Sequence, residues 1–192
     1  MSRDLDDLVP EFKTKFVQLL DRCALRGVSM RQFYTLRTPW EQARIWRSTR
    51  STSEVLQASE RLKSSRAPFL AKVLLAVGPQ YSPPSARGHL TNALPGVSWH
   101  QWGEAVDCFW LVHGKAEWST KTEAQIAGGL KGNGYLIYGD EALELGLFSA
   151  GLGWGWDWPH VQLPNTSSPL NMHSWEQINR KMIARFGETE VS

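Results

Sequence analysis

The segment 98–107 constrains this chain more than any other, because two candidate metal ligands, His100 and Asp107, stand close together in it. An extended chain advances about 3.3 Å per residue, so on one straight strand the two residues would lie roughly 23 Å apart. Ligands of one zinc ion all lie within about 2 Å of it. If both residues bind one ion, the chain must fold back between them, and Gly103 is the residue best able to allow that turn.

The residues after Gly103 predict a buried strand over 105–112, an apolar run that Asp107 interrupts. A lone buried carboxylate is costly unless it is paired or bound to a cation. The pattern therefore favours a cationic partner for Asp107.

A second element, residues 157–160, brings an acid and an imidazole together around Pro159. In an extended segment over 158–163, His160 shares a face with Gln162. Pro159 cannot donate to a ladder, so we expect this segment at a strand start or on a sheet edge, where a ligand could face a cleft.

The two elements together supply the ligand count of a catalytic zinc site. Two neutral His nitrogens and one Asp oxygen, with a fourth position left to water, are typical of catalytic rather than structural zinc. The remaining acid, Asp157, is what such a site needs to take a proton from the bound water. The residues indicate a hydrolase.

The pattern S-x-H-x-x-G-x-A-x-D, followed by a D-x-P-H element, resembles the LAS-type zinc peptidases. These include D-alanyl-D-alanine carboxypeptidases, vancomycin-resistance D,D-dipeptidases and phage L-alanyl-D-glutamate endopeptidases, and they share their metal site with lysostaphin and the hedgehog domain. The fixed positions of the first motif are matched by Ser98, His100, Gly103, Ala105 and Asp107.

The resemblance implies roles for further residues. It implies that Zn²⁺ is bound by His100, Asp107 and His160, and that Asp157 is the general base.

Two further roles follow from the family pattern around Arg37 and Ser98. Many members have an Arg followed five residues later by Gln, which Arg37 and Gln42 match. A guanidinium there would stabilise the oxyanion, although Arg37 could instead be a salt-bridge partner at a strand end. Ser98 is expected to orient a metal ligand through a hydrogen bond.

The same resemblance implies an α+β fold, in which a small antiparallel sheet carries the zinc site and helices flank it, as in the hedgehog and D,D-peptidase domains. It implies a zinc-dependent endopeptidase acting on peptidoglycan stem peptides. Asp157 and the Pro159-His160 pair look more like the phage branch, so we expect cleavage of the L-Ala–D-Glu bond by a phage or prophage endolysin.

Two alternatives stay open. The first is a D-Ala–D-Ala carboxypeptidase or dipeptidase. The second is a zinc-bearing binding module without catalysis, as in the hedgehog domain, which the presence of Asp157 disfavours.

Periodicity and capping signals predict the remaining elements. We expect strands over 28–36 and 105–112, and helices over 5–27, 38–50, 53–65, 68–77, 121–130, 140–147 and 174–187, with a Pro-rich loop over 78–96. Because there are no internal repeats and no clear linker, we expect a single domain over residues 1–192 without a separate wall-binding module.

Composition excludes some classes of partner. With 42% hydrophobic residues among 192, the chain can bury a substantial core. A net charge of +2 is too small to argue for nucleic acid. We expect a monomer whose partner is the stem peptide.

The first seven residues are acidic and polar, unlike a signal peptide, and no apolar run approaches the roughly 18 residues of a membrane span. We therefore expect no membrane insertion, synthesis in the cytoplasm without a signal peptide, and action on the cell wall or periplasm after release.

Three groups of residues are expected to be structural. Cys23 and Cys108 are expected to be free thiols in the core. His89, His113 and His173 are expected at the surface. The tryptophans that crowd the two motifs are expected mostly to fill the core, with one or two lining a groove: Trp99, Trp102, Trp110, Trp154, Trp156 and Trp158.

Overall fold

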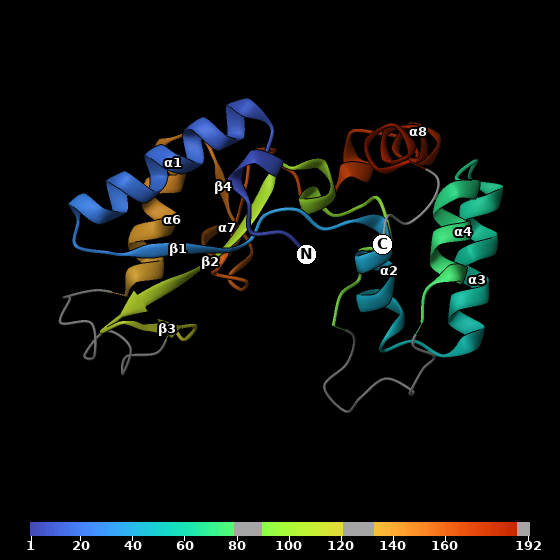
Figure 1. The fold of residues 1–192 in the computed structure, drawn as a ribbon, viewed down its shortest axis with the longest axis horizontal. Coiled ribbons are helices and arrows are strands. Elements are labelled where there is room, and N and C mark those ends of the chain that lie inside the picture. The colour runs from blue at the N-terminus through green and yellow to red at the C-terminus, as the bar shows by residue number, and fades with distance from the viewer. Residues whose placement is uncertain (79–89, 121–132, 188–192) are drawn as a thin grey trace. The chain divides into compact units, whose positions relative to one another are not determined.

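The computed structural model describes residues 1–78, 90–120 and 133–187 (Figure 1). The chain divides into two compact units, each built from two stretches of sequence. The sheet unit comprises Met1–Leu36 and Trp102–Thr166, and the helical unit comprises Arg37–Gln101 and Ser167–Ser192. His89 and the helix predicted over 121–130 lie outside the described residues.

The sheet unit contains all the described strands, and its mixture of helices and antiparallel strands confirms the predicted α+β class. Its elements are the 3-10 helix η1 (Leu5–Asp7), α1 (Pro10–Leu25), β1 (Met30–Tyr34), β2 (Ala105–Val112), β3 (Lys115–Glu117), α6 (Gly134–Glu144), β4 (Phe148–Ser149), α7 (Ala150–Trp154) and β5 (His160–Gln162).

The sheet has the order β1-β2-β5-β4, and every pairing is antiparallel. Strand β3 pairs with the C-terminal part of β2. The strand predicted over 105–112 is confirmed as β2 with the same bounds. In the register of β2 and β5, Asp107 stands opposite His160. The sheet itself therefore brings the two sequence motifs together.

The expectation of a sheet edge at Pro159 is wrong, whereas the expectation of a strand start is confirmed. Pro159 directly precedes β5, which pairs with β2 on one side and β4 on the other. The missing N–H is tolerated there because the carbonyl of Pro159 still accepts from the Cys108 N–H at 2.9 Å.

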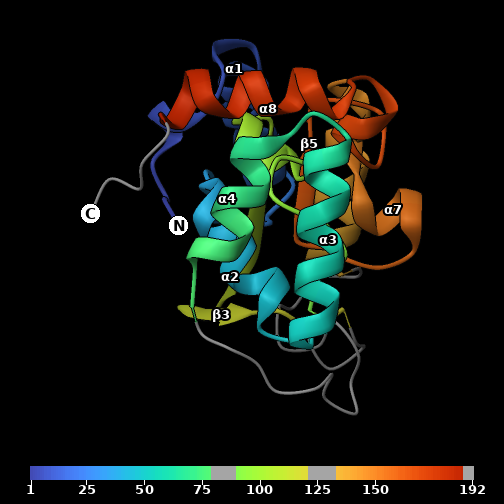
Figure 2. The same ribbon diagram turned by 90° about the vertical axis from the view of Figure 1, so that its right-hand side faces the viewer.

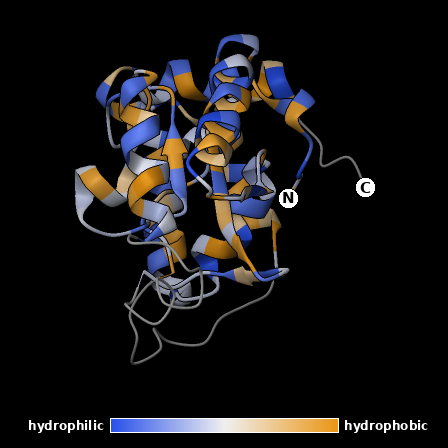
Figure 3. Cartoon of the chain, turned by 90° about the vertical axis from the view of Figure 1, so that its left-hand side faces the viewer, coloured by the Kyte–Doolittle hydropathy of each residue, from blue (hydrophilic) through white to orange (hydrophobic). Residues whose placement is uncertain are grey.

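Helix α1 buries one face against the sheet unit's core. Phe12, Phe16, Leu19 and Cys23 recur at helical spacing and are all buried. The helix was predicted to start at residue 5, but α1 starts at Pro10, and the separate 3-10 turn η1 precedes it. Proline is favoured at this first helical position because its missing N–H would have no partner within the helix. Hydrophobic and hydrophilic residues share the same helices throughout (Figure 3).

Helix α6 differs most from the sequence prediction, since it spans Gly134–Glu144 rather than 140–147. Asn133 caps it by accepting from the Tyr135 N–H. Gly134 weakens the sequence signal for a helix, yet a Cβ there would lie 2.6 Å from the Trp110 ring. Close packing on Trp110 therefore requires the residue that local propensity disfavours.

The helical unit comprises α2 (Pro39–Arg47), α3 (Thr52–Ser64), α4 (Pro68–Ala76), η2 (Trp99–Trp102, which ends in the sheet unit), η3 (Pro169–Asn171) and α8 (Trp175–Phe186). Figure 2 shows α3 and α4 side by side. Capping boxes begin α2, α3 and α8, at Thr38, Ser51 and Ser174. The helix predicted to reach residue 50 ends at Arg47, because Ser51 is needed as the next cap.

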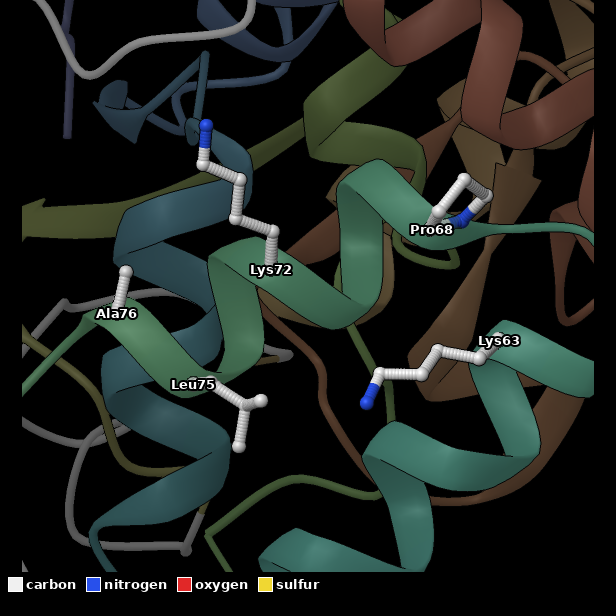
Figure 4. A pocket seen from close by; sticks show the side chains of 5 residues that line it. All are labelled: Lys63, Pro68, Lys72, Leu75 and Ala76. Carbon is white, nitrogen blue, oxygen red and sulfur yellow. The ribbon is translucent and has the colours of Figure 1, made fainter.

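A surface pocket lies on the α3–α4 pair (Figure 4). Its lining residues are Lys63, Pro68, Lys72, Leu75 and Ala76. None of the candidate ligands belongs to it. In the described residues, no helix is both long enough and apolar enough to cross a membrane.

The prediction of two free core thiols is confirmed, since Cys23 and Cys108 are unbonded and buried. Burial, helped by the charge of Glu141, raises the pKa of Cys23 to about 12. Burial also raises the pKa of Cys108. Both thiols therefore stay protonated in the folded protein at pH values where unfolded thiols, with a pKa of about 8.5, ionise.

We expect neither thiol to react with Ellman's reagent at pH 8 until the protein is unfolded, when both should react. Because the thiol pKa values are raised in the folded state, the two thiols stabilise the folded protein fully below about pH 8.5. This stabilisation declines as the pH rises from there toward the pKa of the folded-state thiols. Rapid modification of the native protein at pH 8 would contradict this burial.

Candidate metal centre

The centre is built on a pair of side chains from neighbouring strands. His160 Nδ1 lies 3.0 Å from Asp107 Oδ1, across the β2–β5 pairing. His160 is only 8% exposed, and Asp107 is half-buried. The carboxylate that interrupts the apolar run of β2 thus has the partner that its burial requires.

The environment of His160 favours a positive charge between the two residues. Burial alone would lower the pKa of His160, but the hydrogen bond and negative charge of Asp107, followed by Asp157 and Gln162, outweigh it and raise that pKa. A proton or a metal ion is therefore stabilised where Nδ1 meets the carboxylate.

Two further contacts hold the ring of His160. Its Nε2 lies 3.0 Å from Oε1 of Gln162. The ring of Trp154, at the end of α7, stacks on it with centroids 5.9 Å apart and planes 23° apart. Sequence reasoning assigned no role to Gln162, although strand alternation already placed it on the face of His160.

His100 belongs to η2, the short 3-10 helix in which the division between the units falls, and it is buried. Gly103 follows with φ of 72°, which confirms the turn expected of it. Each of His100, Asp107 and His160 offers a ligand atom, and these atoms lie within 4.8 Å of one another.

This donor set fits zinc. Imidazole nitrogen and carboxylate oxygen bind Zn²⁺ at about 2.1 Å, so ligand atoms around one tetrahedral ion lie roughly 3.4 Å apart. The three side chains offer two imidazoles and one carboxylate, with ligand atoms within 4.8 Å of one another. The described part of the chain therefore contains a His–Asp–His cluster that could bind a metal ion.

Asp157 lies in the turn that leads into β5, and its carbonyl accepts from the His160 N–H at 3.0 Å. Its φ is 56°, in the left-handed region that few residues other than glycine adopt. The negative charge of Asp157 also contributes to the raised pKa of His160.

The predicted pair of Arg37 and Gln42 is in contact within the helical unit. Arg37 Nη1 donates to Oε1 of Gln42 at 2.9 Å, and the buried Gln42 donates in turn to the Ala93 carbonyl at 2.6 Å. The Arg37 N–H donates to the carbonyl of His100 at 3.4 Å. The guanidinium is thus oriented by a buried amide, on a residue whose backbone touches a candidate ligand.

Ser98 is tied into the turn that contains His100. Its N–H donates to Oε1 of Gln101 at 3.4 Å, and its carbonyl accepts from the Gln101 N–H at 3.0 Å. These bonds order the start of η2. That the Ser98 hydroxyl orients a metal ligand stays a prediction.

The tryptophans divide between core and surface. Trp99, Trp102 and Trp110 are buried, as expected of core residues. Trp156 is 62% exposed, and its ring lies 5.4 Å from that of Trp154, the residue stacked on His160. An aromatic pair therefore extends from the candidate ligand to the surface. His113 is exposed and His173 is half-buried.

Comparison with known families gives a match, whereas none of the curated proteins matches the chain. The family model is VanY, D-alanyl-D-alanine carboxypeptidase, and it matches residues 6–128. That range is more than half of the chain and includes Arg37, His100 and Asp107, while Asp157 and His160 lie beyond it. The match agrees with the α+β fold and with the cluster that could bind a metal. The chain belongs to the VanY family of D-alanyl-D-alanine carboxypeptidases, peptidases that act on peptidoglycan-derived peptides.

Proposed function

We propose that this chain is a zinc-dependent endopeptidase that cleaves the L-Ala–D-Glu bond of peptidoglycan stem peptides. The observation that carries the proposal is the cluster of His100, Asp107 and His160, whose ligand atoms lie within 4.8 Å of one another. Three protein ligands leave a fourth position for water, which is the arrangement of catalytic zinc.

In the proposed mechanism, Asp157 and Arg37, which are not metal ligands, have separate tasks. Zinc held by the three ligands would lower the pKa of a water molecule to about 7 and polarise the scissile carbonyl. Asp157 takes the proton of the attacking water as the new C–O bond forms. It then delivers that proton to the amine nitrogen as the C–N bond breaks.

Arg37 has the second task, because negative charge develops on the carbonyl oxygen as water attacks. A guanidinium that donates to this oxygen stabilises the transition state more than the ground state. The bond to Gln42 supports this role, since it fixes the orientation of the guanidinium. Ser98 is proposed to orient a ligand in the same centre.

We expect Arg37→Ala to lower turnover by about 10²–10³-fold, as does the loss of one oxyanion donor. Metal content should not change, because Arg37 is not a ligand. The matched control is Arg31→Ala, which removes an exposed guanidinium bonded only to a neighbouring carbonyl among the bonds described. Wild-type turnover in Arg37→Ala would remove Arg37 from the mechanism.

The choice of bond rests on the second motif. The Asp157-x-Pro159-His160 element resembles the phage endopeptidase branch, which supports L-Ala–D-Glu cleavage by a phage or prophage endolysin. We propose that this endolysin acts on the wall as a monomer after release. The family match favours a second candidate, removal of a terminal D-Ala.

Mass analysis of products from purified wall sacculi separates these candidates. New lactyl-L-Ala ends would support the endopeptidase, and free D-Ala would support the carboxypeptidase. If a zinc-loaded protein released neither product, the non-catalytic binding module would be the better account.

A further inference from the structure

We propose that Gln162 is a positioning residue of the metal centre, which selects Nδ1 of His160 as the metal-binding atom by accepting the proton on Nε2. This inference rests on the proposed function in one respect, namely that the His–Asp–His cluster binds zinc. It assigns a task to a buried amide that neither the motif nor the family match identifies.

The orientation of the Gln162 amide is decided by its backbone partners. Its nitrogen donates to the carbonyls of Pro164 and Thr166, both at 2.7 Å. A carbonyl oxygen can only accept, so the amide nitrogen must face these two groups. The amide oxygen is then directed at His160 Nε2, 3.0 Å away.

This orientation determines how the imidazole of His160 can be used. An amide oxygen accepts but cannot donate, so it stabilises the form in which Nε2 carries a proton. A neutral imidazole has only one N–H, which leaves Nδ1 as the atom with the lone pair. Nδ1 is also the atom that lies 3.0 Å from Asp107, the next candidate ligand.

A lone pair and a carboxylate oxygen at that separation repel each other unless a cation lies between them. Histidines that bind metals usually donate their other ring N–H to an acceptor, which fixes the ring's orientation and makes the ligand more basic. Gln162 is placed to be that acceptor, and Trp154 covers one face of the ring.

The support for Gln162 is rigid. It is the last residue of β5, opposite Ala105 of β2 and Phe148 of β4, and it is only 1% exposed. Its removal would leave His160 Nε2 and two carbonyl groups without this partner. Gln162 could therefore have a purely structural role, in which its hydrogen bonds to Pro164 and Thr166 hold the segment after β5 in place. This role must be separated from the positioning of His160.

Two substitutions separate these roles. Gln162→Glu retains an oxygen that accepts from Nε2 but loses the amide donor to Pro164 and Thr166. Gln162→Met removes both at similar size. We expect zinc affinity, measured by competition with a chelator, to fall about 10–100-fold in Gln162→Met and to stay near wild type in Gln162→Glu.

The zinc-loaded proteins offer a second readout. In the nitrogen-15 spectrum of wild type and Gln162→Glu, Nε2 of His160 should carry the proton and Nδ1 should be the ligand. In Gln162→Met this preference should weaken. Gln18→Met, an exposed amide on α1, is the matched control and should leave both readouts unchanged.

Wild-type zinc affinity in Gln162→Met would overturn the inference. Equal losses of zinc affinity in Gln162→Glu and Gln162→Met would overturn it too. They would show that only the hydrogen bonds from Gln162 to the Pro164 and Thr166 carbonyls matter. Failure of the proposed function has another signature: zinc binds and the variants rank as expected, but sacculi are not cleaved.

Discussion

Replacement of Asp157 by Asn should lower the hydrolysis of purified cell walls by about 10²–10⁴-fold, the loss typical of a missing general base. Asn has nearly the same size and, like Asp, tolerates the left-handed backbone that φ of 56° requires here. It cannot take a proton from water at neutral pH. The measurement is the initial rate of fragment release, together with the zinc content of each protein.

Zinc content should stay near wild type in Asp157→Asn, because this residue is not one of the three proposed ligands. Asp140→Asn, which neutralises an exposed carboxylate on α6, is the matched control and should be fully active. A fully active Asp157→Asn enzyme would contradict the mechanism. Glu104, the residue directly before β2, would be the next acid to test.

Replacement of His160 by Ala should reduce bound zinc from about one ion per chain to a small fraction and abolish hydrolysis. Two ligands remain, and the stacked, hydrogen-bonded ring is lost. Zinc at about 100 times its Kd should stabilise the wild type by about 2.7 kcal/mol, because binding favours the folded state. The variant should show almost none of this stabilisation in thermal unfolding.

The control for His160→Ala is a histidine outside the centre. His113 is exposed and its backbone has φ of 48°. Asn also adopts this left-handed conformation, so His113→Asn removes an imidazole without straining the backbone. Zinc content should be unchanged in it. Unchanged zinc content in His160→Ala would move the ligand set elsewhere.

The sequence predicted the elements whose signals are local. The apolar run over 105–112 has the same bounds as β2, in which one face is buried and the other is mostly half-buried. The capping box at Thr38 is present because its two hydrogen bonds join residues three apart. Close spacing also made the turn at Gly103 predictable.

Features that depend on distant partners could not be predicted in the same way. The position of β5 between β2 and β4 is a property of pairing, which three residues do not encode. The start of α6 depends on the fit of Gly134 against Trp110.

The candidate site shows the same limit. The motif named its candidate ligands, and the structure brings them together. The task proposed for Gln162 depends on where the carbonyls of Pro164 and Thr166 lie after the chain leaves the sheet. No sequence pattern reports the direction of those groups.

If metal held by His100, Asp107 and His160 is needed for the cleavage of wall peptides, removal and return of the metal should stop and restore it. Purified sacculi are digested with the wild-type protein alone, with a chelator, and with a chelator followed by excess Zn²⁺. We predict new peptide ends in the first case, none in the second and full recovery in the third. Cleavage that continues after the metal is removed, with zinc content confirmed as negligible, would contradict the account.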